Sequence, residues 1–211
     1  MKNFKKLICI TNDGSSTIFL PDFNEHYHSK YGAVSESEHV FIKNGLYFWK
    51  KKNPNKKYCN VFEVGFGTGL NAFLTYNQSK FILDTKLMYT SLEPYPLKLS
   101  EIHKLNYSKK LDDNDKIFNF IHHSKWNSPV QLSKNFTLTK NISTLQNFNI
   151  EINQDIIYFD PFCYRVQPEM WSKKIINRIV NSMSKYSVFV TFSSMNILFD
   201  SLKDLKLNVE K

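Results

Sequence analysis

The stretch Val61-Phe62-Glu63-Val64-Gly65-Phe66-Gly67-Thr68-Gly69-Leu70-Asn71 decides the fold of this chain of 211 residues. Its first four residues are mostly apolar and β-favouring, and they predict a buried strand. Glycines at the alternate positions 65, 67 and 69 then predict a tight turn, and the apolar residues from Leu70 onward indicate an amphipathic helix. Such a turn lets the backbone approach a ligand, toward which the following helix directs its free N–H groups. The stretch therefore predicts a strand–turn–helix unit beside a nucleotide-like ligand.

Strand and helix patterns alternate around this unit. Asn12-Asp13-Gly14 separates two apolar runs and predicts a β-hairpin, and Ser35 with Glu38 indicates the cap of a helix that reaches Ile42. We expect a loop at 50–57, a helix-loop insertion at 112–133, strands at 86–93, 136–139, 156–159, 187–193 and from 207, and helices at 70–78, 97–107, 168–185 and 196–206. This order predicts an α/β fold with a doubly wound, mostly parallel sheet over residues 58–211 and an N-terminal extension over residues 1–57.

The chain is strongly basic, with a net charge of +9 from 28 basic and 19 acidic residues. Almost all of the basic residues are lysines, which can hold a phosphate backbone through counterion release without reading bases. A genome rich in A and T would produce the same abundance of Lys, Asn and Ile. The charge therefore permits a nucleic-acid partner and does not identify one.

Cysteine and histidine spacing gives no sign of a disulfide framework or a metal site. Cys9, Cys59 and Cys163 form no C-x-x-C pair, and no apolar run is long enough to cross a membrane. We therefore expect a protein of the reducing cytoplasm, without a membrane or a metal partner. The histidines at 26, 28 and 39 are expected to form hydrogen bonds near the pocket, and those at 122 and 123 to be solvated in a loop.

Two carboxylates follow predicted strands. Glu93 ends the strand at 86–93 and lies 24 residues after Gly69, close to the spacing at which an acid accepts hydrogen bonds from a ribose. Asp160 ends the strand at 156–159 because Pro161 cannot continue the ladder. A carboxylate at this edge can orient an amine and accept its proton. The alternatives are a helix-capping or surface role for Glu93 and a capping or loop-fixing role for Asp160.

The glycine turn resembles the E/D-x-G-x-G-x-G motif of class I S-adenosylmethionine (SAM)-dependent methyltransferases, with Glu63 as its acid. The dinucleotide fingerprint would need a glycine at position 70, where Leu70 stands. Longer blocks are similar to the MnmC/MnmD methyltransferase family from about residue 8 to residue 209. These blocks are Glu25-His26-Tyr27-His28-Ser29 with Gly32-Ala33 and Glu36-Ser37, then Phe62 to Asn71, Glu93-Pro94-Tyr95-Pro96-Leu97, and Asp160-x-Phe162 followed by Pro168-x-Met170-Trp171.

This resemblance implies a Rossmann-like enzyme that uses SAM to methylate the 5-aminomethyl group on the wobble (2-thio)uridine of tRNA. It implies that Glu63, Gly65, Gly67, Gly69 and Glu93 hold SAM and that Asp160 faces the substrate amine. Substrate-side positions, without an assigned role, fall on Tyr27, Ser29, Glu36 and Phe162. The FAD-dependent oxidase domain fused to some relatives is absent from this sequence, so no flavin is implied.

The sequence departs from the family pattern in three places. Cys163 and Tyr164 replace a small residue and a proline, and residues 195–199 replace a glycine and paired arginines. The family's final glycine-rich segment, which should form the last strand, has no counterpart before Lys211, so we expect the sheet to lack the antiparallel edge strand that this segment forms. Two other functions stay open. The first is methylation of an exocyclic amine on another nucleobase, because Asp160-Pro161-Phe162 resembles the D-P-P-Y motif of enzymes that carry out that reaction. The second is RNA binding by a SAM-type fold without catalysis.

Overall fold

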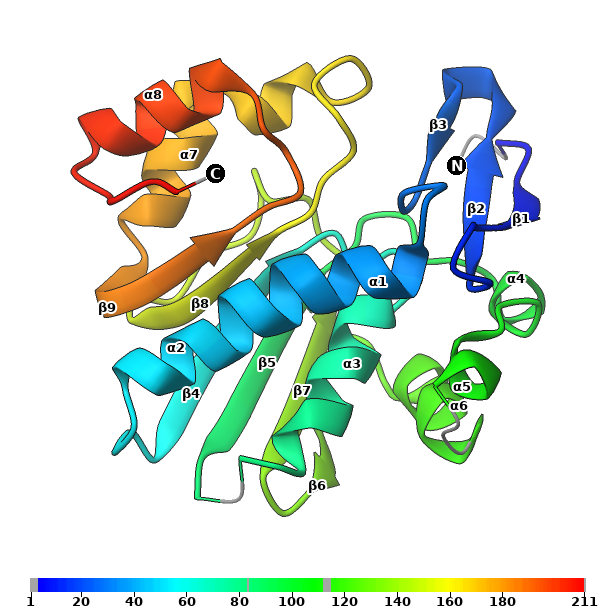
Figure 1. Ribbon diagram of the computed structural model, residues 1–211, viewed down its shortest axis with the longest axis horizontal. Helices are drawn as coiled ribbons and strands as arrows, with labels where there is room; N and C mark the ends of the chain where they lie inside the picture. The colour runs from blue at the N-terminus through cyan, green and yellow to red at the C-terminus, as the bar shows by residue number, and fades with distance from the viewer. Residues whose placement is uncertain (1–3, 83, 112–114, 211) are drawn as a thin grey trace.

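The central element of the fold is a six-stranded sheet, seen in a computed structural model that describes residues 4–82, 84–111 and 115–210 (Figure 1). The strand order is β6-β7-β5-β4-β8-β9, in which β6 is antiparallel to β7 and all other neighbours are parallel. The strands are β4 (Tyr58–Val64), β5 (Lys86–Leu92), β6 (Ser128–Ser133), β7 (Phe136–Asn141), β8 (Gln154–Phe159) and β9 (Met183–Val190). The predicted doubly wound, mostly parallel sheet is confirmed.

The direction of winding changes at β4, which pairs with β5 on one side and with β8 on the other. The sequence of β8 has the pattern of a buried parallel strand, and every residue of β8 is buried in the structure. Ligands of open α/β sheets bind outside the carboxyl ends of the strands at such a reversal. The glycine turn that follows β4 and Asp160, which follows β8, therefore lie side by side at this edge.

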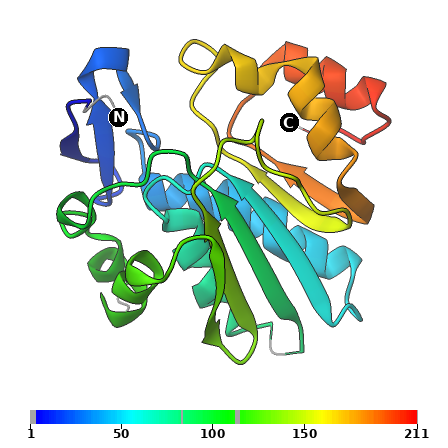
Figure 2. The same cartoon turned by 180° about the vertical axis from the view of Figure 1, so that it is seen from behind.

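Helices cover both faces of the sheet (Figures 1 and 2). One core cluster packs the N-terminal helical segment, α3 (Leu70–Ser79) and α6 (Asp115–His123) on one face. The other cluster packs η3 (Pro168–Trp171), α7 (Lys173–Val180) and α8 (Asn196–Asp204) on the opposite face. Two short helices, α4 (Leu99–Ile102) and α5 (Tyr107–Lys110), lead from β5 toward α6.

The N-terminal extension forms a small antiparallel sheet of β1 (Leu7–Ile10), β2 (Ser16–Leu20) and β3 (Glu25–His26), with the short helix η1 (Pro21–Phe23) between β2 and β3. The predicted hairpin at 7–20 is confirmed. A continuous helical stretch follows, made of α1 (Ala33–Ser37), the π-helical η2 (Glu38–Tyr47) and α2 (Phe48–Lys52). It is much longer than the predicted helix at 35–42, and its apolar residues pack on the sheet, where the rings of Phe41 and Tyr158 lie 5.1 Å apart.

Several predicted boundaries are wrong. The helix predicted to reach Lys185 ends at Val180, and β9 begins at Met183 although the first residues of this edge strand are polar. The helix predicted at 97–107 is two short helices. The helix-loop insertion predicted at 112–133 does contain a helix, α6, but it also contains the strand β6, which was not predicted; residues 112–114 lie outside the described residues. Leu207 and Val209 form no strand, because their side chains pack against the core under α7 and α8 instead.

The helices in the described ranges are all too short or too polar to cross a lipid bilayer.

Candidate functional site

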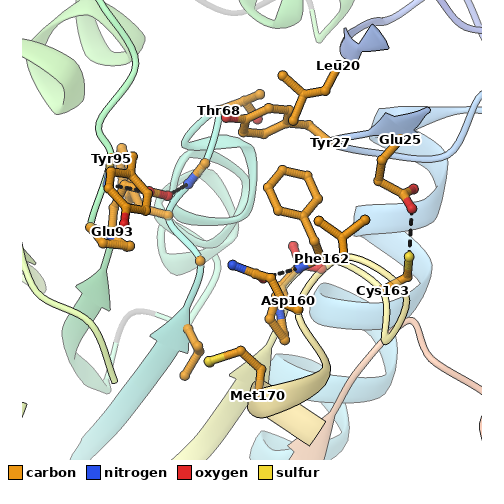
Figure 3. A pocket seen from close by; sticks show the side chains of 18 of the residues that line it. Leu20, Glu25, Tyr27, Thr68, Glu93, Tyr95, Asp160, Phe162, Cys163 and Met170 are labelled. Atoms are coloured by element: carbon orange, nitrogen blue, oxygen red, sulfur yellow. Dashed lines mark hydrogen bonds between the residues drawn. The ribbon is translucent and has the colours of Figure 1, made fainter. Parts of the chain in front are cut away.

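A pocket of about 860 Å³ opens at the carboxyl ends of all five parallel strands, with the N-terminal sheet on one side (Figure 3). The lining residues that follow the strands are Gly65 and Gly67 after β4, Glu93 after β5, Ser143 after β7, Asp160 after β8 and Phe192 after β9. The extension contributes further lining residues from β2, β3 and α1. The pocket therefore brings together segments from nearly the whole chain.

The glycine turn borders the pocket with bare backbone. Gly65 has a φ of +95°, and a Cβ there would come within 2.5 Å of the carbonyl oxygen of Asp160. Gly67 has a φ of +51°, and a Cβ there would lie 3.2 Å from the ring of Tyr27. Both positions require glycine, so the turn presents a concave backbone surface of the kind that fits a nucleoside cofactor. Gly69 begins α3 and packs beside His122, outside the residues that line the pocket.

Glu93 closes the turn from the side of β5. Its Oε2 accepts the backbone N–H of Gly67 at 2.9 Å, and its Oε1 accepts the N–H of Tyr95 at 2.9 Å. Burial raises the pKa of the Glu93 carboxyl, against these two hydrogen bonds. Each carboxylate oxygen has a second lone pair, so the group can still accept hydrogen bonds from ribose hydroxyls.

Asp160 is the carboxylate at the centre of the pocket (Figure 3). Asn71, in the first turn of α3, donates a hydrogen bond from Nδ2 to Asp160 Oδ2 at 2.9 Å. Burial raises the pKa of Asp160 to about 7, the Asn71 hydrogen bond opposes that rise, and the charge of Glu36 adds to it. The carboxyl group is thus able to exchange a proton near neutral pH.

Glu63 lies beneath the turn and does not line the pocket. Its side chain is fully buried, and its Oε2 accepts a hydrogen bond from Ser91 Oγ at 2.6 Å. Burial raises its pKa to about 8, and hydrogen bonds to Ser91 and Asn71 oppose the rise. Asn71 therefore lies between two carboxyl groups, one buried and one facing the pocket.

The four substrate-side residues from the sequence all line the pocket. Tyr27 and Phe162 pack edge to face with ring centroids 5.0 Å apart. The backbone N–H of Ser29 donates to Glu36 Oε1 at 3.0 Å, and burial raises the pKa of Glu36. Two aromatic rings and the Glu36 carboxyl group thus line the pocket together with Asp160, an arrangement suited to a flat ring that carries an amine.

Of the three N-terminal histidines that were predicted to form hydrogen bonds near the pocket, one does so. His28 is buried, its Nε2 lies 2.7 Å from Thr68 Oγ1 in the glycine turn, and burial lowers its pKa to about 4. His26 packs on Phe19, and His39 lies 3.3 Å from Asn44 on the surface. Among residues 4–82, 84–111 and 115–210, no three His, Cys, Asp or Glu side chains are grouped to hold a metal ion.

The pair at 122–123 is not in a loop, because both histidines belong to α6. His122 packs against Phe66 and Phe118 at ring-centroid distances of 5.5 and 4.6 Å, and burial lowers its pKa to about 3. The sequence does not reveal this burial, because one aromatic partner of His122, Phe66, lies 56 positions earlier in the chain. His122 therefore supports the glycine turn from outside.

Sequence reasoning missed two features of the site. No role was predicted for Asn71 within the glycine-turn block. Its position in the first turn of α3, two residues after Gly69, was the available signal. Glu25 accepts hydrogen bonds from Cys163 Sγ and, at 3.1 Å, from Arg165 Nη2, so it joins β3 to the loop after β8. No spacing in the sequence connects residues 140 positions apart.

Comparisons with known proteins agree with this geometry. Residues 120–211 match the model of a family described as S-adenosyl-L-methionine-dependent methyltransferase. Curated relatives bear the name tRNA 5-methylaminomethyl-2-thiouridine biosynthesis bifunctional protein MnmC. That of Leptospira interrogans is 29% identical over 198 residues, covering 90% of this chain and 30% of the relative. That of Campylobacter fetus subsp. fetus is 26% identical over 216 residues, covering 97% of this chain and 33% of the relative.

A solved structure has the same fold. The crystal structure of MNMC2 from Aquifex aeolicus superposes with a TM-score of 0.78 and 22% sequence identity, covering 97% of this chain and 65% of that one. The match confirms the fold of the central sheet together with that of the N-terminal extension. This chain spans about 30% of the length of its first curated relatives, so it corresponds to one part of those bifunctional proteins.

Proposed function

We propose that this chain is a member of the MnmC/MnmD-like methyltransferase family and that it methylates the 5-aminomethyl group on the wobble (2-thio)uridine of tRNA with SAM as methyl donor. The observation that carries the proposal is the single pocket in which the glycine turn, Glu93 and Asp160 meet. The names of the curated relatives point to the same modified uridine. A tRNA substrate would place the reaction in the cytoplasm, as the unpaired cysteines predict.

The cofactor side of the pocket consists of the bare turn at Gly65 and Gly67 together with the carboxylate of Glu93. In this proposal the turn takes the nucleoside and methionine parts of SAM, and Glu93 accepts hydrogen bonds from the ribose hydroxyls. SAM supplies a methyl group that is already activated on a sulfonium. The chain therefore needs only to place the amine in line with it and to manage one proton.

Asp160 performs both of these tasks at the substrate amine. Its carboxylate accepts a hydrogen bond from the amine N–H, which directs the nitrogen lone pair toward the methyl group, and it then takes the proton that the methylated nitrogen releases. The charge of Glu36 raises the pKa of Asp160, which makes its carboxylate a stronger acceptor for that proton. Tyr27 and Phe162 exclude water around the uridine ring.

The test is transfer from isotopically labelled SAM to tRNA that carries the 5-aminomethyl group, followed by mass spectrometry of the nucleosides. We expect label in 5-methylaminomethyl-(2-thio)uridine. Asp160→Asn should lower kcat by at least about 100-fold and leave the Kd for SAM nearly unchanged, because the variant keeps the shape of the side chain and loses the proton acceptor.

Three outcomes separate this function from its alternatives. Label in the exocyclic amine of another nucleobase would identify a different amino-methyltransferase. Tight SAM binding in calorimetry without transfer to any tRNA would identify a non-catalytic RNA-binding protein. Full turnover by Asp160→Asn would contradict the role of this carboxylate, whatever the substrate.

Glu93→Ala tests the cofactor side separately. Loss of the ribose contacts and of the hydrogen bond to Gly67 N–H should raise the Kd for SAM by at least about tenfold, since each such charged hydrogen bond is worth roughly 1.5–3 kcal/mol. Calorimetry with SAM measures the change. Asp22→Ala, at an exposed acid of η1, is the matched control and should leave the Kd as it is.

A further inference from the structure

One end of the molecule, beside the pocket, consists of the N-terminal sheet together with α4, α5 and α6 (Figures 1 and 2). Asn106 holds these parts together, since its backbone N–H donates to Ser16 Oγ and its side chain donates to the carbonyl oxygen of Gly14, both at 2.9 Å. Lys6 of the extension forms an ion pair with Glu101 of α4 at 3.2 Å. The three segments thus form one surface, which is continuous with the pocket because Lys6 and Lys98 line it.

This surface, which we name the basic face, carries far more exposed positive than negative side chains. Its exposed acids in the described part of the chain are Asp22 and Asp115. Its exposed lysines are Lys5, Lys30, Lys98, Lys104, Lys109, Lys110, Lys116 and Lys125. Two further acids of the described residues are engaged, because Glu101 pairs with Lys6 and Asp13 accepts hydrogen bonds from Ser15 and Ser35.

Lysines 104, 109 and 110 are central to the basic face. All three are exposed, Lys104 between α4 and α5 and the other two on α5, and no ion pair to any of them occurs within the described ranges. Lysines without an ion-pair partner can neutralise phosphates, and each phosphate that they neutralise releases a counterion that was condensed on the nucleic acid.

The most conspicuous lysine cluster of the sequence, at residues 50–57, lies at the opposite edge of the sheet. It spans the end of α2 and the start of β4, at the amino ends of the strands and away from the pocket. Lys50 and Lys57 are paired with Asp84 at 3.1 and 3.5 Å, and Lys56 is paired with Asp155 at 3.4 Å. This cluster is therefore partly neutralised and is poorly placed to meet a substrate that enters the pocket.

We propose that the basic face is the docking surface for the sugar–phosphate backbone of the tRNA, and that it guides the anticodon arm so that the wobble base enters the pocket. The inference rests on the proposed tRNA substrate. Lysines supply point charges without base readout, so the face sets affinity and orientation and leaves the choice of nucleobase to the pocket.

The experiment compares two triple variants of equal charge change. Lys104→Ala/Lys109→Ala/Lys110→Ala removes charge from the basic face, and Lys51→Ala/Lys52→Ala/Lys86→Ala removes the same charge from exposed lysines at the opposite edge. Fluorescence anisotropy with an anticodon stem-loop RNA, over a series of salt concentrations, gives Kd and its salt dependence. Calorimetry with SAM and the melting temperature report the integrity of each variant.

We expect the basic-face variant to bind the RNA at least about tenfold more weakly and to lower the slope of log K against log salt by about 2, because each phosphate contact contributes roughly 0.7–0.9 to that slope. The opposite-edge variant should match the wild type within about twofold, because its lysines lie away from the pocket. It controls for the loss of net charge, which is the same in the two triple variants. Both variants should keep the wild-type Kd for SAM.

Equal loss in the two triple variants, or no loss in the basic-face variant, would overturn the docking surface. These results are distinct from failure of the proposed function. Wild-type RNA binding that depends on the basic face, without methyl transfer to aminomethyl-tRNA, would contradict the function and support the surface. Methyl transfer with an unchanged KM for tRNA in the basic-face variant would support the function and contradict the surface. Absence of RNA binding by the wild type would contradict both.

Discussion

The proton affinity of Asp160 is set by two neighbours that act in opposite directions. The amide of Asn71 donates to the carboxylate and favours its ionised form, whereas the charge of Glu36 disfavours it. Burial raises the pKa to about 7, so these two side chains decide how much carboxylate is present at neutral pH. A proton acceptor is most effective when its pKa lies near the working pH.

The pH dependence of methyl transfer should follow this balance. We expect kcat/KM of the wild type to rise with pH through a midpoint of about 7, because the protonated form of Asp160 cannot take up the proton that the amine releases. Asn71→Ala should move the midpoint upward and Glu36→Gln should move it downward, each by about one unit, since a lost charged hydrogen bond or charge pair is worth about that much.

Profiles of kcat/KM against pH for the three proteins measure these shifts. Shifts of the same sign in both variants would contradict the opposing roles, because a general loss of packing has no reason to move them apart. Ser143→Ala, at a lining residue without charge, serves as the control and should keep the wild-type midpoint.

The sequence predicted which residues gather around the glycine turn, but it did not predict which of them line the pocket and which are buried beneath it. The glycine spacing correctly predicted bare backbone at Gly65 and Gly67, because φ values of +95° and +51° there require glycine. The same motif gave Glu63 and Gly69 the same status, yet Glu63 is buried beneath the turn and Gly69 packs on His122. Side chains alternate across a strand, but a sequence does not say which face a ligand occupies.

The long helical segment at 33–52 is held at its start by the hairpin turn of the extension. Asp13 Oδ2 accepts the backbone N–H of Ser35 at 2.9 Å and its hydroxyl at 2.8 Å, and Asp13 Oδ1 accepts from Thr11 and Ser15. Burial would raise the pKa of Asp13, and the hydrogen bonds from Ser15 and Ser35 outweigh it, so that the pKa lies well below its usual range. The cap predicted at Ser35 is thus supplied by a residue 22 positions earlier.

Asp13→Ala should destabilise the protein by about 2 kcal/mol, because it leaves the first turn of the helix and two buried hydroxyls without their acceptor. A carboxyl with a depressed pKa contributes stability above its unfolded pKa of 3.8 and loses it as the pH falls through the folded value. Urea unfolding at pH 7 and at pH 3 measures both effects. Asp22→Ala should change the free energy of unfolding by less than about 0.5 kcal/mol, and an equal loss in both variants would contradict the capping role.

Helices and strands were predictable where one face is clearly apolar, as in β8 and α3. The boundary near residue 181 was not, because the apolar spacing of α7 continues to Met183, where β9 already begins. β6 was missed for a related reason: this edge strand alternates only weakly and contains a proline, which an edge position tolerates. The formation of an edge strand depends on its packing against neighbouring strands, and the local sequence pattern carries no information about those neighbours.

The pocket forms between two parts of the molecule that are far apart in the chain, the N-terminal sheet and the loops of the central sheet (Figure 1). Arg165, in the loop after β8, donates to the carbonyl oxygens of Phe23 and Asn24 and pairs with Glu25 at 3.1 Å. These contacts join the loop that carries Asp160 to β3, which leads to Tyr27. The substrate side of the pocket therefore depends on the docking of one part on the other.

Arg165→Ala should loosen this docking without unfolding the central sheet. Because the guanidinium donates to two backbone carbonyls and one carboxylate, we expect faster amide hydrogen exchange in residues 16–27 and a KM for tRNA raised by at least about fivefold. The Kd for SAM should stay within about twofold, since the glycine turn and Glu93 make no contact with Arg165. Hydrogen exchange by mass spectrometry and steady-state kinetics measure these effects, with Lys173→Ala, at an exposed ion pair with Asp204, as the control. Unchanged exchange in residues 16–27, or a loss of SAM affinity equal to the rise in KM, would show that the extension holds its place without this arginine.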